Sequence, residues 1–248
     1  MGCCETTRKE NVTDKAEKSP RAKEKSPPKP SQAVKEPSVE LDPVQNQLCE
    51  ATLIDLKTHN KANAIRLAFA AAKVNYKETL LSPEEWAAQS QSSPHAKLPI
   101  LEVSGMQLAG EAVLRYVCQT KGMYPVITDI KAVYRCESIC EGIAEQTREL
   151  VEGIRQGALA QNRAYKETRY LLRELDSAVQ DSSPYLIGAV LTMADLMCLD
   201  FLWTFFLSPT KRLAHWDKVP SLLADYIHIL LNTHPDLQAA VESRLSHP

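Results

Sequence analysis

Hydrophobic and polar positions follow three different patterns along this chain of 248 residues. The first part has no regular apolar spacing. The second alternates short apolar, β-branched runs, typical of strands, with segments that carry an apolar residue every three or four positions, typical of helices. In the last part only the helical spacing remains. The chain is therefore predicted to hold a disordered tail over 1–46, a mixed α/β domain over 47–122 and an all-helical domain over 123–248.

The mixed domain is predicted to have a thioredoxin-like order of elements, βαβ-α-ββα. Ser104-Gly105 is a two-residue turn between two strands, and Ser82 followed by Pro83 has the chemistry of a helix start. Pro99 lacks an N–H and therefore suits the first position of a strand. The Leu98–Pro99 peptide bond can be cis at such a position. The predicted strands are 51–56, one entered through 74–78, 100–103 and 106–108, and the predicted helices are 61–73, one from 82 and one from 110.

The all-helical domain is predicted to contain five helices. Its clearest local signal is Thr192 followed by Asp195, a capping box flanked by Leu191 and Leu196 as a hydrophobic staple. Asp195 is therefore expected to be structural. Four aromatic residues are expected to lie partly in the core and partly on a ligand-binding cleft between the domains, namely Phe201, Trp203, Phe205 and Phe206. The helices are expected at 128–156, 162–181, 192–207, 220–232 and 235–245.

Composition narrows the classes of function. The formal net charge of -2 does not indicate a basic surface for binding nucleic acid. No apolar run is long enough for a membrane span or a secretory signal. The seven cysteines have neither disulfide-like nor metal-like spacing and no Cys-x-x-Cys, which predicts a reducing compartment. Cys136 and Cys140 stand one helical turn apart without a second pair, so we expect packing on a helix face and no metal. His215 and His228 are expected to be core or surface residues.

The tail carries signals for attachment to a membrane. Gly2 follows Met1, and Thr6 supplies the hydroxyl of the N-myristoylation pattern, while Cys3 and Cys4 are suited to palmitoylation. Two acyl chains give stable binding, whereas one gives only marginal binding. The residues that follow are rich in Lys, Glu, Pro and Ser, which predicts a disordered spacer. The protein is therefore expected to be peripheral and lipid-anchored at the cytoplasmic face of a membrane.

Several stretches of the two folded domains resemble the cytosolic glutathione transferases, in particular the sigma type. They are AxAIRLxFAxAxVxY at 62–76, EEW at 84–86, LPILEV at 98–103, AVLRY at 112–116 and the segment around the capping box. The similarity covers nearly everything after residue 49. It implies a thioredoxin-like domain followed by an all-helical glutathione transferase domain, glutathione as co-substrate or ligand, and a homodimer.

The resemblance also implies a set of glutathione-binding positions. Leu98, before a cis Pro99, would pair through its backbone with the cysteinyl unit, and Lys97 stands where the family has a glutamine. Ala109 and Gly110 replace the Gln-Ser pair that holds the γ-glutamyl carboxylate. Side-chain donors are lost there, although a helix N-terminus remains to offer backbone N–H groups.

Three further positions complete the implied site. Trp86 matches the family's tryptophan, and Glu141 takes the place of an acid that contacts the glutathione amino group from the partner subunit. Asp55 stands at the position of the catalytic tyrosine, whose hydroxyl lowers the thiol pKa of glutathione. An ionised aspartate only accepts hydrogen bonds, and its charge would raise that pKa.

Two functions remain open for the chain. A membrane-tethered transferase would conjugate glutathione to an apolar electrophile, with Thr58, His59 or Asn60 as candidate thiol activators in the loop after the first strand. Thr58 or Asn60 would donate a hydrogen bond, and a protonated His59 would favour the thiolate. The alternative, which the residue types favour, is that these three are ordinary polar residues of a loop. The alternative is a non-catalytic scaffold or binding module that keeps the fold, and Asp55 with Ala109-Gly110 favours it.

Overall fold

The computed structural model describes residues 48, 50–57, 62–91, 97–181, 184–207 and 219–243. Several of the residues singled out from the sequence lie outside these ranges. They are the acylation candidates Gly2, Cys3 and Cys4, the candidate activators Thr58, His59 and Asn60, and His215.

Four strands form one mixed sheet in the spatial order β2-β1-β3-β4. The first strand is parallel to the second and antiparallel to the third, and the last two form a hairpin. Ser104 and Gly105 have φ of 48° and 74°, the left-handed pair that a tight hairpin turn requires. The strands are β1 (Thr52–Leu56), β2 (Lys77–Leu81), β3 (Ile100–Val103) and β4 (Met106–Ala109).

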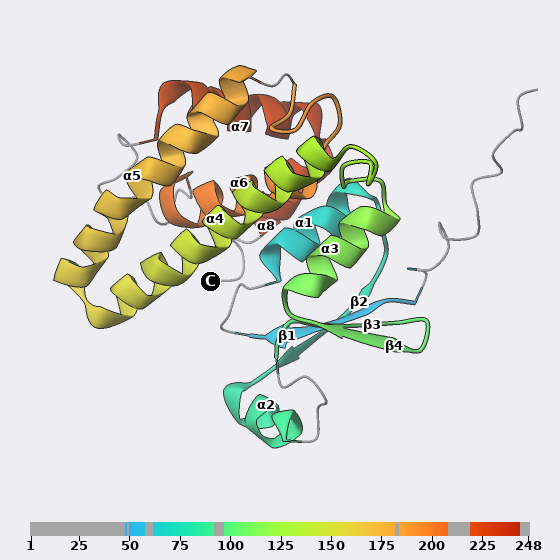
Figure 1. The fold of residues 1–248 in the computed structure, drawn as a ribbon. Coiled ribbons are helices and arrows are strands. Elements are labelled where there is room, and N and C mark those ends of the chain that lie inside the picture. Colours follow the sequence, from blue (N-terminus) through green and yellow to red (C-terminus); the bar gives the residue numbers. More distant parts are fainter. Residues whose placement is uncertain are drawn as a thin grey trace, which may run out of the picture. The chain divides into compact units, whose positions relative to one another are not determined.

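Helices cover both faces of this sheet, as the thioredoxin-like plan predicts. Figure 1 shows α1 (Asn63–Ala71) and α3 (Glu111–Thr120) on one face and α2 (Pro83–Ser90) on the other. The start of α2 is a complete capping box, in which the Ser82 N–H donates to Glu85 Oε2 at 2.6 Å and the Glu85 N–H donates to Ser82 Oγ at 3.2 Å. The predicted element order of the mixed domain is therefore confirmed.

The remainder of the described chain is helical, and α4 and α5 form a long antiparallel pair (Figure 1). Gly157, with φ of 100°, ends the first of these helices, and α5 begins at the next residue, four positions before the prediction. The helix predicted over 192–207 changes after Leu202 into a π-helical turn. The elements are α4 (Ile130–Gln156), α5 (Ala158–Asp181), α6 (Met193–Leu202), η2 (Trp203–Leu207), α7 (Ser221–Thr233) and α8 (Pro235–Ser243).

The sheet part and the helical part share one apolar core, because α1 packs against both α6 and α8. Both parts belong to one compact unit, so the boundary predicted between 122 and 123 stays a prediction. Phe201, Phe205 and Phe206 are all buried in the core, and Trp203 is half-buried. Within the described ranges, no helix has the length and apolar character needed to cross a membrane.

Residues that the sequence assigned to packing are found in packing roles. Cys136 and Cys140 are free and buried, as are Cys118 and Cys198. Asp195 is fully buried and completes the predicted capping box at the start of α6. His228 lies on the surface of α7, one of the two positions expected for it.

Candidate functional site

Five of the predicted glutathione-binding residues meet at one corner of the sheet. The Leu98–Pro99 bond is cis, as the sequence admits. Pairing between β1 and β3 ends at Ile100, so the backbone of Leu98 lies beyond the paired part of the strand. Ala109 pairs with Ile100 across the hairpin, and the Gly110 N–H donates to the Pro99 carbonyl at 2.8 Å. The topology of the hairpin therefore joins the two predicted contact segments directly.

Gly110 forms the N-cap of α3 and has φ of 67° and ψ of -141°, a conformation that favours glycine. A Cβ built there would have the Lys97 Cδ as its nearest neighbour, at 3.9 Å, so the lysine side chain lies close to this turn. A helix N-terminus and a lysine both attract a carboxylate, whereas the exposed Glu111 in the first turn of α3 opposes it. The backbone and Lys97 fit an anionic peptide-like ligand.

Asp55 does not fit the role of a thiol activator. It lies at the end of β1 and has no exposed surface, because strand alternation turns it to the same side as the buried Leu53. Its Oδ2 accepts from the Ala62 N–H at 3.3 Å and from Arg66 Nη2 at 3.2 Å. Among the described residues, its Oδ1 has no partner with hydrogen-bond geometry. Asp55 thus links β1 to the start of α1.

Arg66 holds a small charged network together beside this carboxylate. Its Nε donates to Glu78 Oε1 at 2.7 Å, and its Nη1 donates to Asn63 Oδ1 at 2.9 Å. Burial raises the pKa of Asp55 and is the largest effect. The Leu56 N–H, the charge of Arg66 and the other hydrogen bonds act in the opposite direction, because they favour the ionised form. The ionised group can only accept, so residue 55 has no hydrogen to give to a thiolate.

The other predicted contacts lie on different elements. Trp86 is half-buried on α2, a helix without a fully buried residue, on the sheet face opposite α1 and α3 (Figure 1). Glu141 is exposed on α4 and is therefore open to a partner molecule. The structure thus groups the hairpin residues, while Trp86 and Glu141 stand apart from that group on their own helices.

An ion pair that sequence reasoning missed connects the two parts of the chain. Arg115 on α3 donates to both carboxylate oxygens of Glu137 on α4, at 2.8 and 2.6 Å, and the Tyr124 hydroxyl donates to the same group at 2.6 Å. Hydrogen bonding from Arg115 lowers the pKa of Glu137. Glu141 lies one helical turn further along the same helix. Arg115 falls within the AVLRY motif, which is the only sequence signal that pointed to it.

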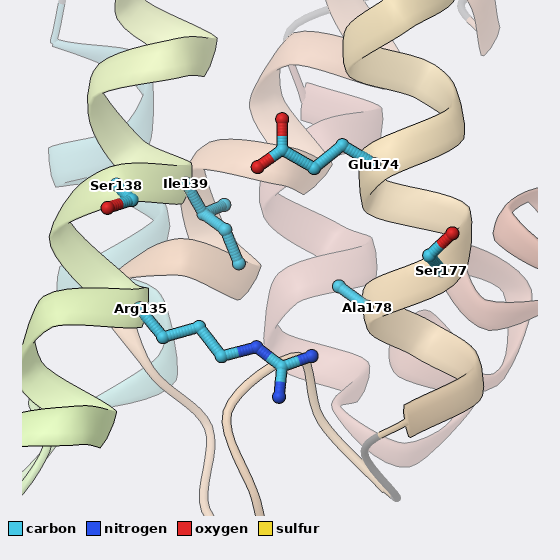
Figure 2. A pocket seen from close by; sticks show the side chains of 6 residues that line it. All are labelled: Arg135, Ser138, Ile139, Glu174, Ser177 and Ala178. Atoms are coloured by element: carbon cyan, nitrogen blue, oxygen red, sulfur yellow. The ribbon is translucent and has the colours of Figure 1, made fainter.

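A shallow cavity of about 280 Å³ lies between α4 and α5. Figure 2 shows Arg135 and Glu174 reaching across it from the two helices, with Ile139 and Ala178 between them. None of its lining residues was predicted to bind glutathione. Within the part of the chain that the structure describes, no group of three or more His, Cys, Asp or Glu is arranged to hold a metal ion.

Comparison with known proteins finds sequence relatives named as glutathione transferases and S-crystallins. No family model matches the sequence. S-crystallin 2 of Enteroctopus dofleini is 22% identical over 220 residues, which cover 79% of this chain and 91% of that protein. Glutathione S-transferase 1 of Ascaris suum is 26% identical over 181 residues, which cover 66% of this chain and 79% of that protein.

Solved structures agree with these sequence relatives. A monomeric glutathione S-transferase of the hookworm Necator americanus superposes with a TM-score of 0.68 at 23% identity, over 79% of this chain and 97% of that one. A sigma class glutathione transferase of Fasciola hepatica gives a TM-score of 0.65 at 18% identity, over 79% and 96% of the two chains. The chain therefore has the glutathione transferase fold, which confirms the predicted fold class.

Proposed function

We propose that this protein is a sigma-like member of the glutathione transferase family that binds glutathione without activating its thiol through residue 55. Support for binding comes from the hairpin corner, where the cis Leu98–Pro99 bond and the N-terminus of α3 lie together. Support for the family comes from the fold and from relatives that carry the transferase name. The buried Asp55–Arg66 ion pair supports the second part of the proposal, that residue 55 does not activate the thiol.

Each part of glutathione has a proposed partner in this chain. The Leu98 backbone pairs with the cysteinyl unit, and Ala109-Gly110 with Lys97 receives the γ-glutamyl carboxylate. Trp86 contacts the peptide from α2, and Glu141 contacts the amino group across a homodimer. This assignment keeps the backbone half of the family's site. It exchanges side-chain hydrogen-bond donors for the positive charge of Lys97.

Residue 55 decides between a binding protein and an enzyme. A thiol activator has to donate a hydrogen bond to the sulfur or carry positive charge beside it. The Asp55 carboxylate does neither, and it is already engaged by Ala62 and Arg66. The favoured function is therefore non-catalytic binding of glutathione or of its conjugates.

A conjugating transferase is the second candidate, and the names of the sequence relatives favour it. In that case Thr58, His59 or Asn60 supplies the missing donor, and an apolar electrophile is the second substrate. An assay of conjugation by the full chain separates the two functions. Binding without turnover supports the first, and turnover that falls in a variant of one of these three residues supports the second.

The proposed location is the cytoplasmic face of a membrane, through acyl chains on Gly2 and on Cys3 or Cys4. Metabolic labelling with a myristate analogue tests it. The wild-type chain is expected to take up the label and a Gly2→Ala chain is not. Uptake that survives in Gly2→Ala contradicts the tether.

Calorimetric titration of the full chain with glutathione tests the binding site itself. Lys97→Ala is expected to weaken binding about tenfold, the effect of one charge-assisted hydrogen bond. Lys77→Ala is the matched control, because Lys77 is also exposed but lies on β2, away from the hairpin. Equal affinities for the two variants would contradict the role of Lys97, and a wild-type chain that does not bind would contradict the proposed function.

A further inference from the structure

Three positively charged side chains lie together on one exposed face of α5. Lys166, Arg169 and Arg173 are all exposed, and their spacing of three and four positions aligns them along the helix. These three residues are called the α5 stripe. At 1.5 Å per residue, the stripe extends about 10 Å along the helix axis.

The α5 stripe lies on the side of α5 that faces away from α4. Ala164 marks the side that packs on α4, because a Cβ built on Gly153 of that helix would lie 3.1 Å from the Ala164 Cβ. At 3.6 residues per turn, the stripe falls on the opposite side of α5 from Ala164. Glu174 instead lines the cavity between α4 and α5 (Figure 2). The stripe is therefore separate from that cavity and from the face of α4 that carries Glu141.

The cations of the α5 stripe keep their charge available to a ligand. Within the described part of the chain, none of them forms an ion pair with a carboxylate. Arg169 donates from Nη2 to the Tyr170 hydroxyl at 2.9 Å and lies 4.8 Å from the centre of that ring, which holds the guanidinium without neutralising it. Asp176, three positions after Arg173, accepts from the Leu223 N–H at 3.2 Å at the start of α7.

The α5 stripe differs from an ordinary solvated helix face, on which charges of opposite sign alternate. On α4, for example, Arg155 pairs at 2.6 Å with Glu152, three positions before it. Each step along the stripe instead joins two cations, and such like-charge neighbours lower the stability of a helix. An anionic surface would remove this repulsion. The charge pattern therefore favours a role in binding over simple solvation.

A large apolar side chain continues the stripe toward the start of the helix. Leu159 is 89% exposed and stands seven positions before Lys166, so the two share one helix face. Leucine beside lysine and arginine is the composition of an interfacial helix, in which the apolar group enters the headgroup boundary and the cations meet anionic lipids. The formal net charge of -2 argues against nucleic acid as the anionic partner.

We propose that the α5 stripe and Leu159 bind the anionic headgroups of a lipid bilayer. The proposal rests on the membrane location put forward above, and it gives the folded part of the chain its own contact with the lipid. One acyl chain alone binds a membrane only marginally, and a basic patch is one of the second signals that make the binding stable. The contact also fixes the orientation of the protein, with the outer side of α5 toward the bilayer.

Co-sedimentation with vesicles tests the stripe without the acyl chains. Every protein is the full chain with Gly2→Ala, Cys3→Ser and Cys4→Ser, so any difference arises in the folded part. This chain is the parent of the variants below. The vesicles are phosphatidylcholine alone or phosphatidylcholine mixed with phosphatidylserine.

The first comparison removes charge. Lys166→Gln with Arg173→Gln is expected to bind mixed vesicles about thirtyfold more weakly than the parent, at about fivefold for each cation lost, and to bind phosphatidylcholine as the parent does. Lys77→Gln with Lys131→Gln is the matched control, because both lysines are exposed on other elements and the net charge changes equally. The control is expected to bind mixed vesicles within about twofold of the parent, since salt screens distant charges.

The second comparison removes apolar contact. Leu159→Ser is expected to bind both kinds of vesicle about tenfold more weakly than the parent, because the burial of one leucine side chain is lost. Ile229→Ser is the control, since Ile229 is 59% exposed on α7. It is expected to bind as the parent does.

Three results would overturn the proposal. They are equal binding of mixed vesicles by the parent and by Lys166→Gln with Arg173→Gln, an equal loss in the lysine control, and light scattering in which the parent self-associates through the stripe without binding vesicles. A failure here leaves the acyl tether intact, since no protein in the test is acylated. A failure of myristate labelling leaves the stripe intact, since the stripe is measured without acyl chains.

Discussion

Two buried aspartates, one in each part of the molecule, have opposite surroundings. Asp195, in the helical part, receives four hydrogen bonds: from the Leu186 N–H at 2.8 Å, the Thr192 N–H and hydroxyl at 2.6 and 2.7 Å, and the Tyr226 hydroxyl. Among the described residues, the two bonds of hydrogen-bond geometry that Asp55 receives, in the sheet part, are longer and both end on its Oδ2. Both are fully buried, and burial raises the pKa of both.

The difference indicates that Asp195 contributes more to the stability of the fold than Asp55 does. Asp195 ties the loop before α6, the first turn of α6 and α7 into one network, so its role is complete within the chain. Among the described residues, the partners of Asp55 are on its Oδ2 alone, at the N-terminus of α1 and on Arg66. Burial disfavours the charged form of Asp55, and Arg66 offsets part of that cost. In the structure, Asp55 links β1 to α1 through the Ala62 N–H and Arg66.

The largest effect is expected from Asp195→Ala. The substitution leaves the N–H groups of Leu186 and Thr192 and the Tyr226 hydroxyl buried without acceptors, which should lower the free energy of unfolding by about 4 kcal/mol. Chemical denaturation measures this value. Asp225→Ala, an exposed position on α7, is the control and should change stability by less than about 0.5 kcal/mol. A similar small change for Asp195→Ala would remove the contrast between the two aspartates.

Arg66→Ala is expected to have the next largest effect. It leaves the buried Asp55 carboxylate without its counter-charge, which should cost about 3 kcal/mol in the same measurement. Lys73→Ala is the matched control, because Lys73 pairs with Asp236 at 3.5 Å with both side chains more than half exposed. Loss of such a surface pair costs less than about 1 kcal/mol. Equal losses would show that the Asp55–Arg66 pair behaves as a surface pair.

Asp55→Asn should have the smallest effect at neutral pH, within about 1 kcal/mol, because the amide oxygen can still accept from Ala62 and Arg66. Its signature is the pH dependence. The folded-state pKa of Asp55 is raised above 3.8, so the folded state holds a proton that the unfolded state releases first. Stability therefore falls as the pH rises from about this value through the folded pKa, and stays lower above it. Chemical denaturation across this pH range should show the fall in the free energy of unfolding for the wild-type chain but not for Asp55→Asn. An identical pH profile for the two proteins would contradict the raised pKa of Asp55.

Strong periodic patterns made most of the fold predictable. The hairpin around Ser104-Gly105 and the capping boxes at Ser82 and Thr192 are local features, so the residues that form them are neighbours in sequence. The predicted start of α5 was less accurate, because Gly157 ends α4 and α5 begins at the next residue without a loop. The π-helical turn after Leu202 leaves no trace in hydrophobic spacing, since the helical pattern continues through it.

The candidate site was predictable only in its backbone half. The hairpin brings Leu98, Pro99 and Gly110 together through strand pairing, which sequence order already implies. The pairing of Asp55 with Arg66 depends on how α1 packs against β1. From the sequence, these are two charged residues 11 positions apart, and nothing indicates that they are buried together. The bond between Arg115 and Glu137 has the same origin in tertiary packing.

Ultraviolet absorbance during a titration of the full chain with glutathione tests the central claim most directly, because one experiment follows both saturation and the thiolate band. We expect saturable binding in which bound glutathione at neutral pH shows no more thiolate absorbance than free glutathione. A thiolate band that grows with saturation would contradict this account, since it would mean that the chain activates the thiol despite an acceptor-only carboxylate at residue 55.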